Sequence, residues 1–200
     1  TIAGLCHSGT DVDVATDTTR DIVACSAAPD DYAEWYETEA DVEFGDVVEL
    51  TDKTFTYFAS QSDPFTGQIL KDKVVKTLPV LRRATTNSSQ KILGIISTSP
   101  IQAIGSDLKE QGSHPMPVAL AGRVPLKVTS ENGPIEIGDY LTSSSTPGVA
   151  MKAAENGPTI GKALASYNNP DPSAVGKIIT FVNNSWYNPD IIVRGDITEL

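Results

Sequence analysis

The sequence predicts an all-β protein, either a β-barrel or a β-sandwich, with an extended N-terminal arm. No segment of twelve or more residues keeps the apolar period of an amphipathic helix. Thirteen Pro and fifteen Gly interrupt the 200 residues every few positions, which is typical of short strands joined by turns. A short Gly-Asp cassette also occurs twice, and such self-similarity indicates a duplicated structural unit.

The cassette reads Glu-apolar-Gly-Asp, followed by two apolar or aromatic residues. It occupies residues 43–48 and 136–141, and an apolar segment with an internal Gly follows each copy, at 92–96 and 159–164. Gly tolerates positive φ, and Asp accepts hydrogen bonds from nearby backbone amides. We therefore expect each cassette to be a turn that launches a strand, with structural roles for Gly45, Asp46, Gly138 and Asp139.

Strands are expected where apolar and polar side chains alternate between turn residues. The alternation is clearest in the segments 116–128 and 177–182. Asn-Gly or Pro-Gly turns separate the later strands. The expected strands are 46–50, 54–60, 74–83, 91–97, 116–128, 139–142, 149–153, 161–166 and 177–182.

Two short helical segments are expected, around 30–37 and around 106–111. In the first, Tyr32, Trp35 and Tyr36 have helical spacing, so they would anchor the segment on the β domain while the acidic residues face water.

Three parts of the chain are expected from composition. Residues 1–40 form an N-terminal arm, since the Thr- and Asp-rich stretch 11–21 has no apolar core of its own. Residues 41–187 form the β-barrel or sandwich, and residues 188–200 form an extended tail. We expect the arm to lie against the barrel or a neighbouring subunit, and both ends to connect to something larger.

The two cysteines, Cys6 and Cys25, enclose the polar part of the arm. A disulfide between them would staple this loop and would suit an extracellular protein. Buried free thiols, or a reactive or metal-binding thiol, are the alternatives.

The charge balance indicates which partners to exclude. Fifteen basic against 26 acidic residues give a net charge of −11, which repels nucleic acid and anionic lipid. No apolar run is long enough for a membrane span, and no signal peptide opens the chain. No cofactor or metal is expected, because the acids of 11–17 lack the Gly and Glu of a calcium loop and phosphate-binding Gly motifs are missing.

The segment 30–37 holds four acids and three aromatics among eight residues. Besides the anchoring role, Glu34 or Asp31 in a partly desolvated pocket would suit a general acid or base. Arg123, in an apolar setting, is the buried ion-pair partner to consider for these acids. His7 and His114 are the only histidines, and Gly-x-Ser-x-Gly is absent, so a conventional hydrolase site is not expected.

Four motifs occur in an order that resembles a known class of domain. They are residues 31–34, the Gly-Asp of the first cassette, the strand 92–97 before Pro100, and residues 118–124. The chain from about residue 30 to 187 resembles C-terminal domains of phage tailspike, neck-appendage and bacterial fibre-like surface proteins, including autoproteolytic intramolecular-chaperone domains.

This resemblance implies a β-rich domain at the end of an extracellular, cell-surface or virion fibre. It implies a homotrimer that helps three chains register and fold, with the upstream fibre region of the same chain as a further partner. Some such domains cut themselves off with carboxylate and hydroxyl groups. By motif, Glu34 would be the acid, with Asp31 beside it, and Ser26 is the closest upstream hydroxyl.

Three functions therefore remain as hypotheses. The first is a structural and assembly domain of a fibre-type protein, without enzymatic activity. The second is a self-cleaving chaperone domain that uses Glu34. The third is a capsid-decorating or carbohydrate-binding module, in which Trp186 and Tyr187 would stack on sugars.

Overall fold

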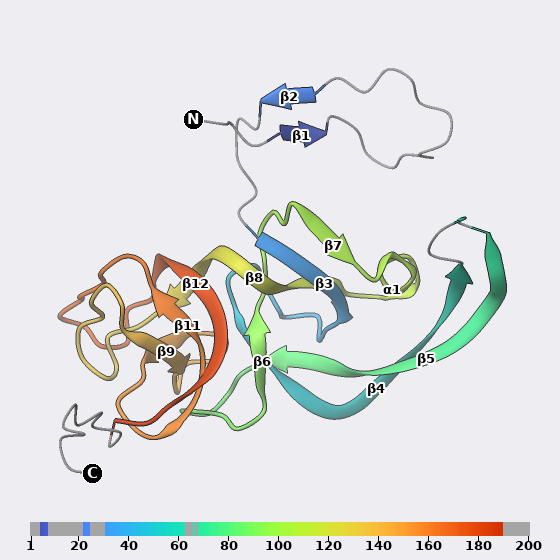
Figure 1. The fold of residues 1–200 in the computed structure, drawn as a ribbon. Helices are drawn as coiled ribbons and strands as arrows, with labels where there is room; N and C mark the ends of the chain where they lie inside the picture. Colours follow the sequence, from blue (N-terminus) through green and yellow to red (C-terminus); the bar gives the residue numbers. More distant parts are fainter. Residues whose placement is uncertain (1–4, 8–21, 25–30, 63–65, 67, 190–200) are drawn as a thin grey trace, which may run out of the picture.

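The computed structural model describes residues 5–7, 22–24, 31–62, 66 and 68–189. These residues are mostly β, as the sequence predicts, and the described part contains one short helix (Figure 1). The elements are β1 Leu5–His7, β2 Ile22–Ala24, β3 Asp31–Glu37, β4 Val47–Ser62, β5 Ile69–Arg83, β6 Ile92–Ile95, β7 Gln102–Ile104, α1 Ser106–Gln111, β8 Pro115–Val128, β9 Tyr140–Ser143, β10 Ala150–Lys152, β11 Gly157–Ala163 and β12 Gly176–Tyr187.

Seven strands form one sheet in the order β10-β9-β11-β12-β8-β3-β7. Strand β10 also pairs in parallel with β8, at Ala150 and Val128. This pairing closes β8, β9, β10, β11 and β12 into a ring, which we call the second barrel. A separate antiparallel pair joins β1 to β2.

A first barrel precedes the second in the chain and shares β8 with it. Strands β5, β4 and β6 form a three-stranded sheet. A parallel bridge from Thr38 to Leu81 joins β5 to the end of β3, and an antiparallel bridge from Ile96 to Val118 joins the end of β6 to β8. Strand β3 also pairs with the N-terminal half of β8. The five strands β3, β5, β4, β6 and β8 therefore close into a ring, and this ring is the first barrel.

Each barrel has its own apolar core, and the start of β4 lies between the two. Adjacent strand residues point to opposite faces. Val47 accordingly packs in the core of the second barrel, while Val48 packs in that of the first, and neither side chain is exposed. Strand β4 is therefore buried on both faces where it begins.

The two Gly-Asp cassettes form the same turn. In each, the Asp carboxylate accepts a hydrogen bond from the backbone N–H of the Glu three residues earlier, over 2.8 Å in both copies. The Gly has positive φ, 81° at Gly45 and 94° at Gly138. Its N–H donates to a carbonyl of the following Gly-containing strand, that of Ile96 or Ala163.

The strands around the cassettes also share one register. Two residues after the Asp, Val48 pairs with Gly94 and Arg83, and Leu141 pairs with Gly161 and Lys152. The bridge from Thr38 to Leu81 has its counterpart in the pairing of Val128 with Ala150. Strands β3, β4, β5 and β6 thus correspond to β8, β9, β10 and β11.

The expected helix around residues 30–37 is wrong, because this segment is strand β3. It lies between β7 and β8 in the large sheet, so that sheet includes residues on both sides of the boundary expected at residue 40. Trp35 packs with Leu108 and Tyr57, whereas Tyr36 packs in the first-barrel core. Neighbouring aromatics that face opposite sides suit a strand rather than one face of a helix.

The other expected elements agree with the structure more closely. The helix expected around 106–111 is α1, and each expected strand overlaps an observed one. The segments 46–50 and 54–60 belong to one long strand, β4, since a register shift between Leu50 and Thr54 interrupts only its pairing with β5. The three-residue strand β7 was not expected, because it is too short for its alternation to be recognised.

The hairpin of β4 and β5 projects away from both barrels (Figure 1). On its inner face, Tyr57 and Ala59 pack against Leu108 of α1. The side-chain amide of Gln111 supports the hairpin edge, because it accepts from the Phe58 N–H over 3.0 Å and donates to the Phe58 carbonyl over 2.8 Å.

Replacement of Gly161 by Ala tests the close approach of β11 to β12. A Cβ at this position would overlap the Phe181 carbonyl oxygen and would lie 2.9 Å from Thr180 Cγ2. We expect Gly161→Ala to lower the free energy of unfolding by about 2–3 kcal/mol, as overpacking does, measured by urea denaturation. In Gly157→Ala, the matched control, the nearest atom is 3.7 Å away, so the change should stay within about 0.5 kcal/mol. Equal changes in the unfolding free energy of the two variants would contradict the close approach of β11 to β12 at Gly161.

Candidate functional site

The two predicted acids of β3 have different partners. Asp31 is 4 % exposed, and its Oδ1 accepts a hydrogen bond from the Ser97 hydroxyl over 3.1 Å. Glu34 is partly buried, and its Oε2 accepts from the Tyr36 hydroxyl over 3.2 Å. Each carboxylate therefore accepts a hydrogen bond from a neighbouring hydroxyl.

The Tyr36 hydroxyl is held in its neutral form. Burial raises the pKa of Tyr36 to about 12, and the charge and hydrogen bond of Glu34 act in the same direction. Burial and the charge of Glu34 also raise the pKa of Tyr57. Because Tyr36 keeps its proton, it donates to Glu34, and the pair orders this end of β3.

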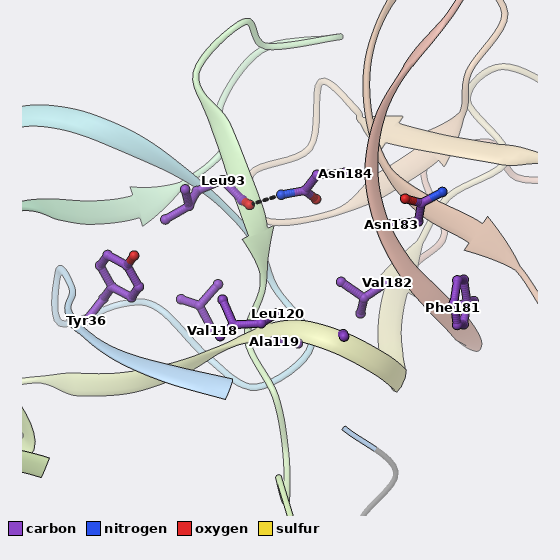
Figure 2. Close-up of a pocket in the computed structure, with 10 residues that line it drawn as sticks. Tyr36, Leu93, Val118, Ala119, Leu120, Phe181, Val182, Asn183 and Asn184 are labelled. Atoms are coloured by element: carbon purple, nitrogen blue, oxygen red, sulfur yellow. Dashed lines mark hydrogen bonds between the residues drawn. The ribbon is translucent and has the colours of Figure 1, made fainter. Parts of the chain in front are cut away.

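Beside Tyr36, an apolar groove of about 440 Å³ runs between β8, β12 and β6 (Figure 2). Residues 118–121 of β8 line its floor. Leu120 and Phe181 line the groove and remain about half exposed. Asn184 donates from its amide to the Leu93 carbonyl over 2.6 Å. Apolar walls with a few polar groups suit the binding of another apolar surface.

An ion cluster around the buried carboxylate of Asp46 joins the two barrels at the first cassette. Asp46 is 1 % exposed, and its carboxylate lies 2.8 Å from Arg83 Nε of β5 and 2.7 Å from Lys127 Nζ of β8. Lys127 also binds Glu43 over 2.7 Å. Arg83 reaches Asp41 and Glu43 at 3.8 and 3.5 Å. These five residues form what we call the Asp46 cluster.

Contacts with opposite charges shift the pKa values of three groups in the Asp46 cluster. Burial alone would lower the pKa of Lys127 and of Arg83, but their hydrogen bonds and charge contacts with Asp46 outweigh it and raise both pKa values. The hydrogen bond and charge of Lys127 lower the pKa of Glu43. Arg83, Lys127 and Glu43 therefore stay ionised at neutral pH.

The second cassette has a smaller ion pair. Asp139 lies 2.9 Å from Lys152 Nζ, and Lys152 occupies the position that corresponds to Arg83. Asp139 is 21 % exposed. Its hydrogen bond is the largest cause that raises the pKa of Lys152. The structural roles predicted for Gly45, Asp46, Gly138 and Asp139 stay predictions.

The remaining predicted residues divide between described and undescribed parts of the chain. Cys6 lies in β1, opposite Val23. Cys25 and Ser26 lie outside the described residues, so the disulfide and the self-cleaving site stay predictions. Arg123 is exposed on β8, opposite Phe181, so its expected burial is wrong, because the strand turns this side chain outward.

Sequence reasoning missed the cations that neutralise the cassette carboxylates. Arg83 and Lys127 lie 37 and 81 residues from Asp46 in the chain. Comparison of the two cassette units would have found the first, because Arg83 and Lys152 end corresponding strands.

Among the described residues, no group of three or more His, Cys, Asp or Glu side chains is arranged to hold a metal ion. No helix in the described part of the chain is long and apolar enough to cross a membrane. Comparison of the chain with protein-family models, curated proteins and solved structures found no match.

The two cassette aspartates provide a matched test of the Asp46 cluster. Asp46→Asn leaves two partly buried cations without their main counter-charge, so we expect a loss of about 3 kcal/mol in the free energy of unfolding. Asp139→Asn removes one partly exposed pair and should cost about 1 kcal/mol or less. Urea denaturation of both variants at neutral pH measures the difference. Equal losses of unfolding free energy would show that burial of Asp46 between the barrels does not make its ion pairs contribute more than that of Asp139.

Proposed function

We propose that this protein is a structural and assembly domain of an extracellular or virion fibre-type protein, and that it associates with itself as a homotrimer. The observation that carries the proposal is a pair of different apolar surfaces on one chain. One is the outer face of the β4–β5 hairpin, and the other is the groove that contains Leu120 and Phe181. Exposed apolar surfaces of this kind are typical of protein interfaces.

Three consecutive cross-strand pairs on the outer face of the hairpin are uncharged. Phe58 and Val75 face each other across the hairpin and are 51 % and 62 % exposed. The neighbouring pair, Thr56 and Thr77, joins its hydroxyls over 2.9 Å. Thr54 and Pro79 form the next pair. In a chain with a net charge of −11, these uncharged pairs let two copies approach with less repulsion than an acidic surface would.

Two different surfaces favour a head-to-tail contact between copies. An isologous dimer needs one surface that complements itself, whereas a heterologous contact joins two different surfaces and forms a ring when the rotation between copies closes. The hairpin of one copy would lie in the groove of the next, with Phe58 and Val75 against Leu120 and Phe181. Three such contacts close a trimer, the state implied by the resemblance to fibre domains.

A trimer of this kind would suit the end of a fibre. Each hairpin would reach from its own barrels to the neighbouring copy, so the three chains would be tied together only once each barrel had folded. Correct registration of the chains would then depend on folding of the domain.

Charge substitutions on the two surfaces test this proposal. We expect Phe58→Asp and Leu120→Asp each to convert the trimer to a monomer, measured as native mass by light scattering, because each buries a carboxylate in an apolar contact. Val175→Asp is the control, since Val175 is also exposed, at 51 %, but lies on neither surface. It should remain trimeric.

A mixture of the two charge variants then tests the head-to-tail geometry. Phe58→Asp keeps an intact groove and Leu120→Asp keeps an intact hairpin, so an equimolar mixture should form a heterodimer. A monomeric wild type at all concentrations would overturn self-association. A mixture that stays monomeric, although the wild type is trimeric, would overturn the pairing of hairpin with groove.

A further inference from the structure

Strand β4 has one strand partner along the projecting hairpin. Its pairing with β6 covers residues 47–49, and from 54 to 62 the strand pairing described for β4 is with β5. The side of β4 opposite β5 is therefore an edge of the sheet over these residues. Edge strands present backbone N–H and C=O groups that can pair with another chain.

A side-chain amide occupies this edge at Phe58. The Gln111 side chain accepts from the Phe58 N–H over 3.0 Å and donates to the Phe58 carbonyl over 2.8 Å. A residue of a neighbouring antiparallel strand makes the same two bonds to its partner in a hydrogen-bonded pair. The Gln111 amide therefore takes the place of one residue of a neighbouring strand.

The two bonds to Phe58 also show which residues of β4 turn their backbone groups toward this edge. The pairing of Thr54 through Phe58 with β5 has no register shift, and the direction of the backbone groups repeats every second residue. The groups of Thr54 and Thr56 therefore point the same way as those of Phe58. Pro79, the partner of Thr54, agrees with this direction, because proline has no N–H to donate to β4.

The sequence of this edge suits pairing with a second copy of the chain. Residues 54–62 contain no charged residue, no Gly and no Pro, and they include three aromatic residues and two Thr. Uncharged segments with such high β-propensity are typical of strands that pair between chains. In a chain with a net charge of −11, two copies of this segment can lie side by side with little charge repulsion.

The other edge of the hairpin is protected by charge. Strand β5 carries Lys71, Lys73 and Lys76, and all three are exposed. Lysines on an edge strand keep it from pairing with another chain. Strand β4 has no such charge in residues 54–62, and Gln111 lies at its edge instead.

We propose that the edge of β4 at residues 54–58 is a surface for strand pairing with β4 of a second copy, and that Gln111 closes it. The Gln111 amide occupies the position from which a residue of the second copy would bind Phe58. The helix α1 holds it there, because Gln111 Nε2 also donates to the Asp107 carbonyl over 2.8 Å, and Leu108 is buried against Tyr57.

Light scattering and hydrogen exchange test the proposal in the Leu120→Asp variant, whose altered groove removes the interface of the proposed trimer. In this background, we expect Gln111→Ala to associate into larger species as its concentration rises. When dilute, its Phe58 amide should exchange about tenfold faster, because the hydrogen bond to Gln111 is lost, and association should restore its protection. Glu110→Ala changes the neighbouring exposed residue of α1, and this control should match the background in mass and exchange.

A second variant separates an opened edge from a loosened hairpin. Gln111→Lys also removes the amide but places a charge at the edge, so it should keep the mass of the background. Gln111→Ala that keeps the background mass at all concentrations would overturn the proposal. So would equal association of Gln111→Ala and Gln111→Lys. Both results differ from failure of the proposed trimer, because each variant is compared with Leu120→Asp, whatever the mass of the wild type.

Discussion

The buried carboxylate of Asp46 is the constraint on which the arrangement of the two barrels depends. A carboxylate removed from water must be compensated by hydrogen bonds and opposite charges. Its partners come from three segments that are distant in the chain, namely the cassette itself, Arg83 at the end of β5 and Lys127 in β8. These segments must therefore meet at one point. Because Lys127 lies in the part of β8 that pairs with β12, the ion cluster fixes the start of β4 and the end of β5 to the second barrel.

Strand β8 can serve two barrels because it changes direction where it passes between them. Val118 lies in the first core, and Val124, Leu126 and Val128 lie in the second. Between them, a bulge opposite Tyr32 and Ala33 leaves Leu120 as an extra residue, and Gly122 has a φ of 117°. A bulge bends a strand and changes where its side chains point. Here it turns Leu120 outward, into the groove proposed as an interface.

The features predicted from the sequence were those with local signals. Period-two alternation predicted β8 and β12, and the repeated Gly-Asp predicted two turns that the structure shows to be alike. The features missed depend on distant residues. Three aromatics in 31–37 suggested a helix, but pairing with β7 and β8 makes this segment a strand. Neither the cations on Asp46 nor the groove beside Phe181 has a local pattern, since each forms only when strands far apart in the chain meet.

The central claim is that the two barrels form one cooperative unit, because they share β8 and the Asp46 cluster. Native-state hydrogen exchange measures this directly, through the opening free energies of amides in β4 and β6 of the first barrel and in β9 and β11 of the second. If the claim holds, the most protected amides of both barrels exchange through the same global opening, with one free energy and one dependence on denaturant. Two separate free energies, with the first barrel opening while the second stays closed, would contradict it.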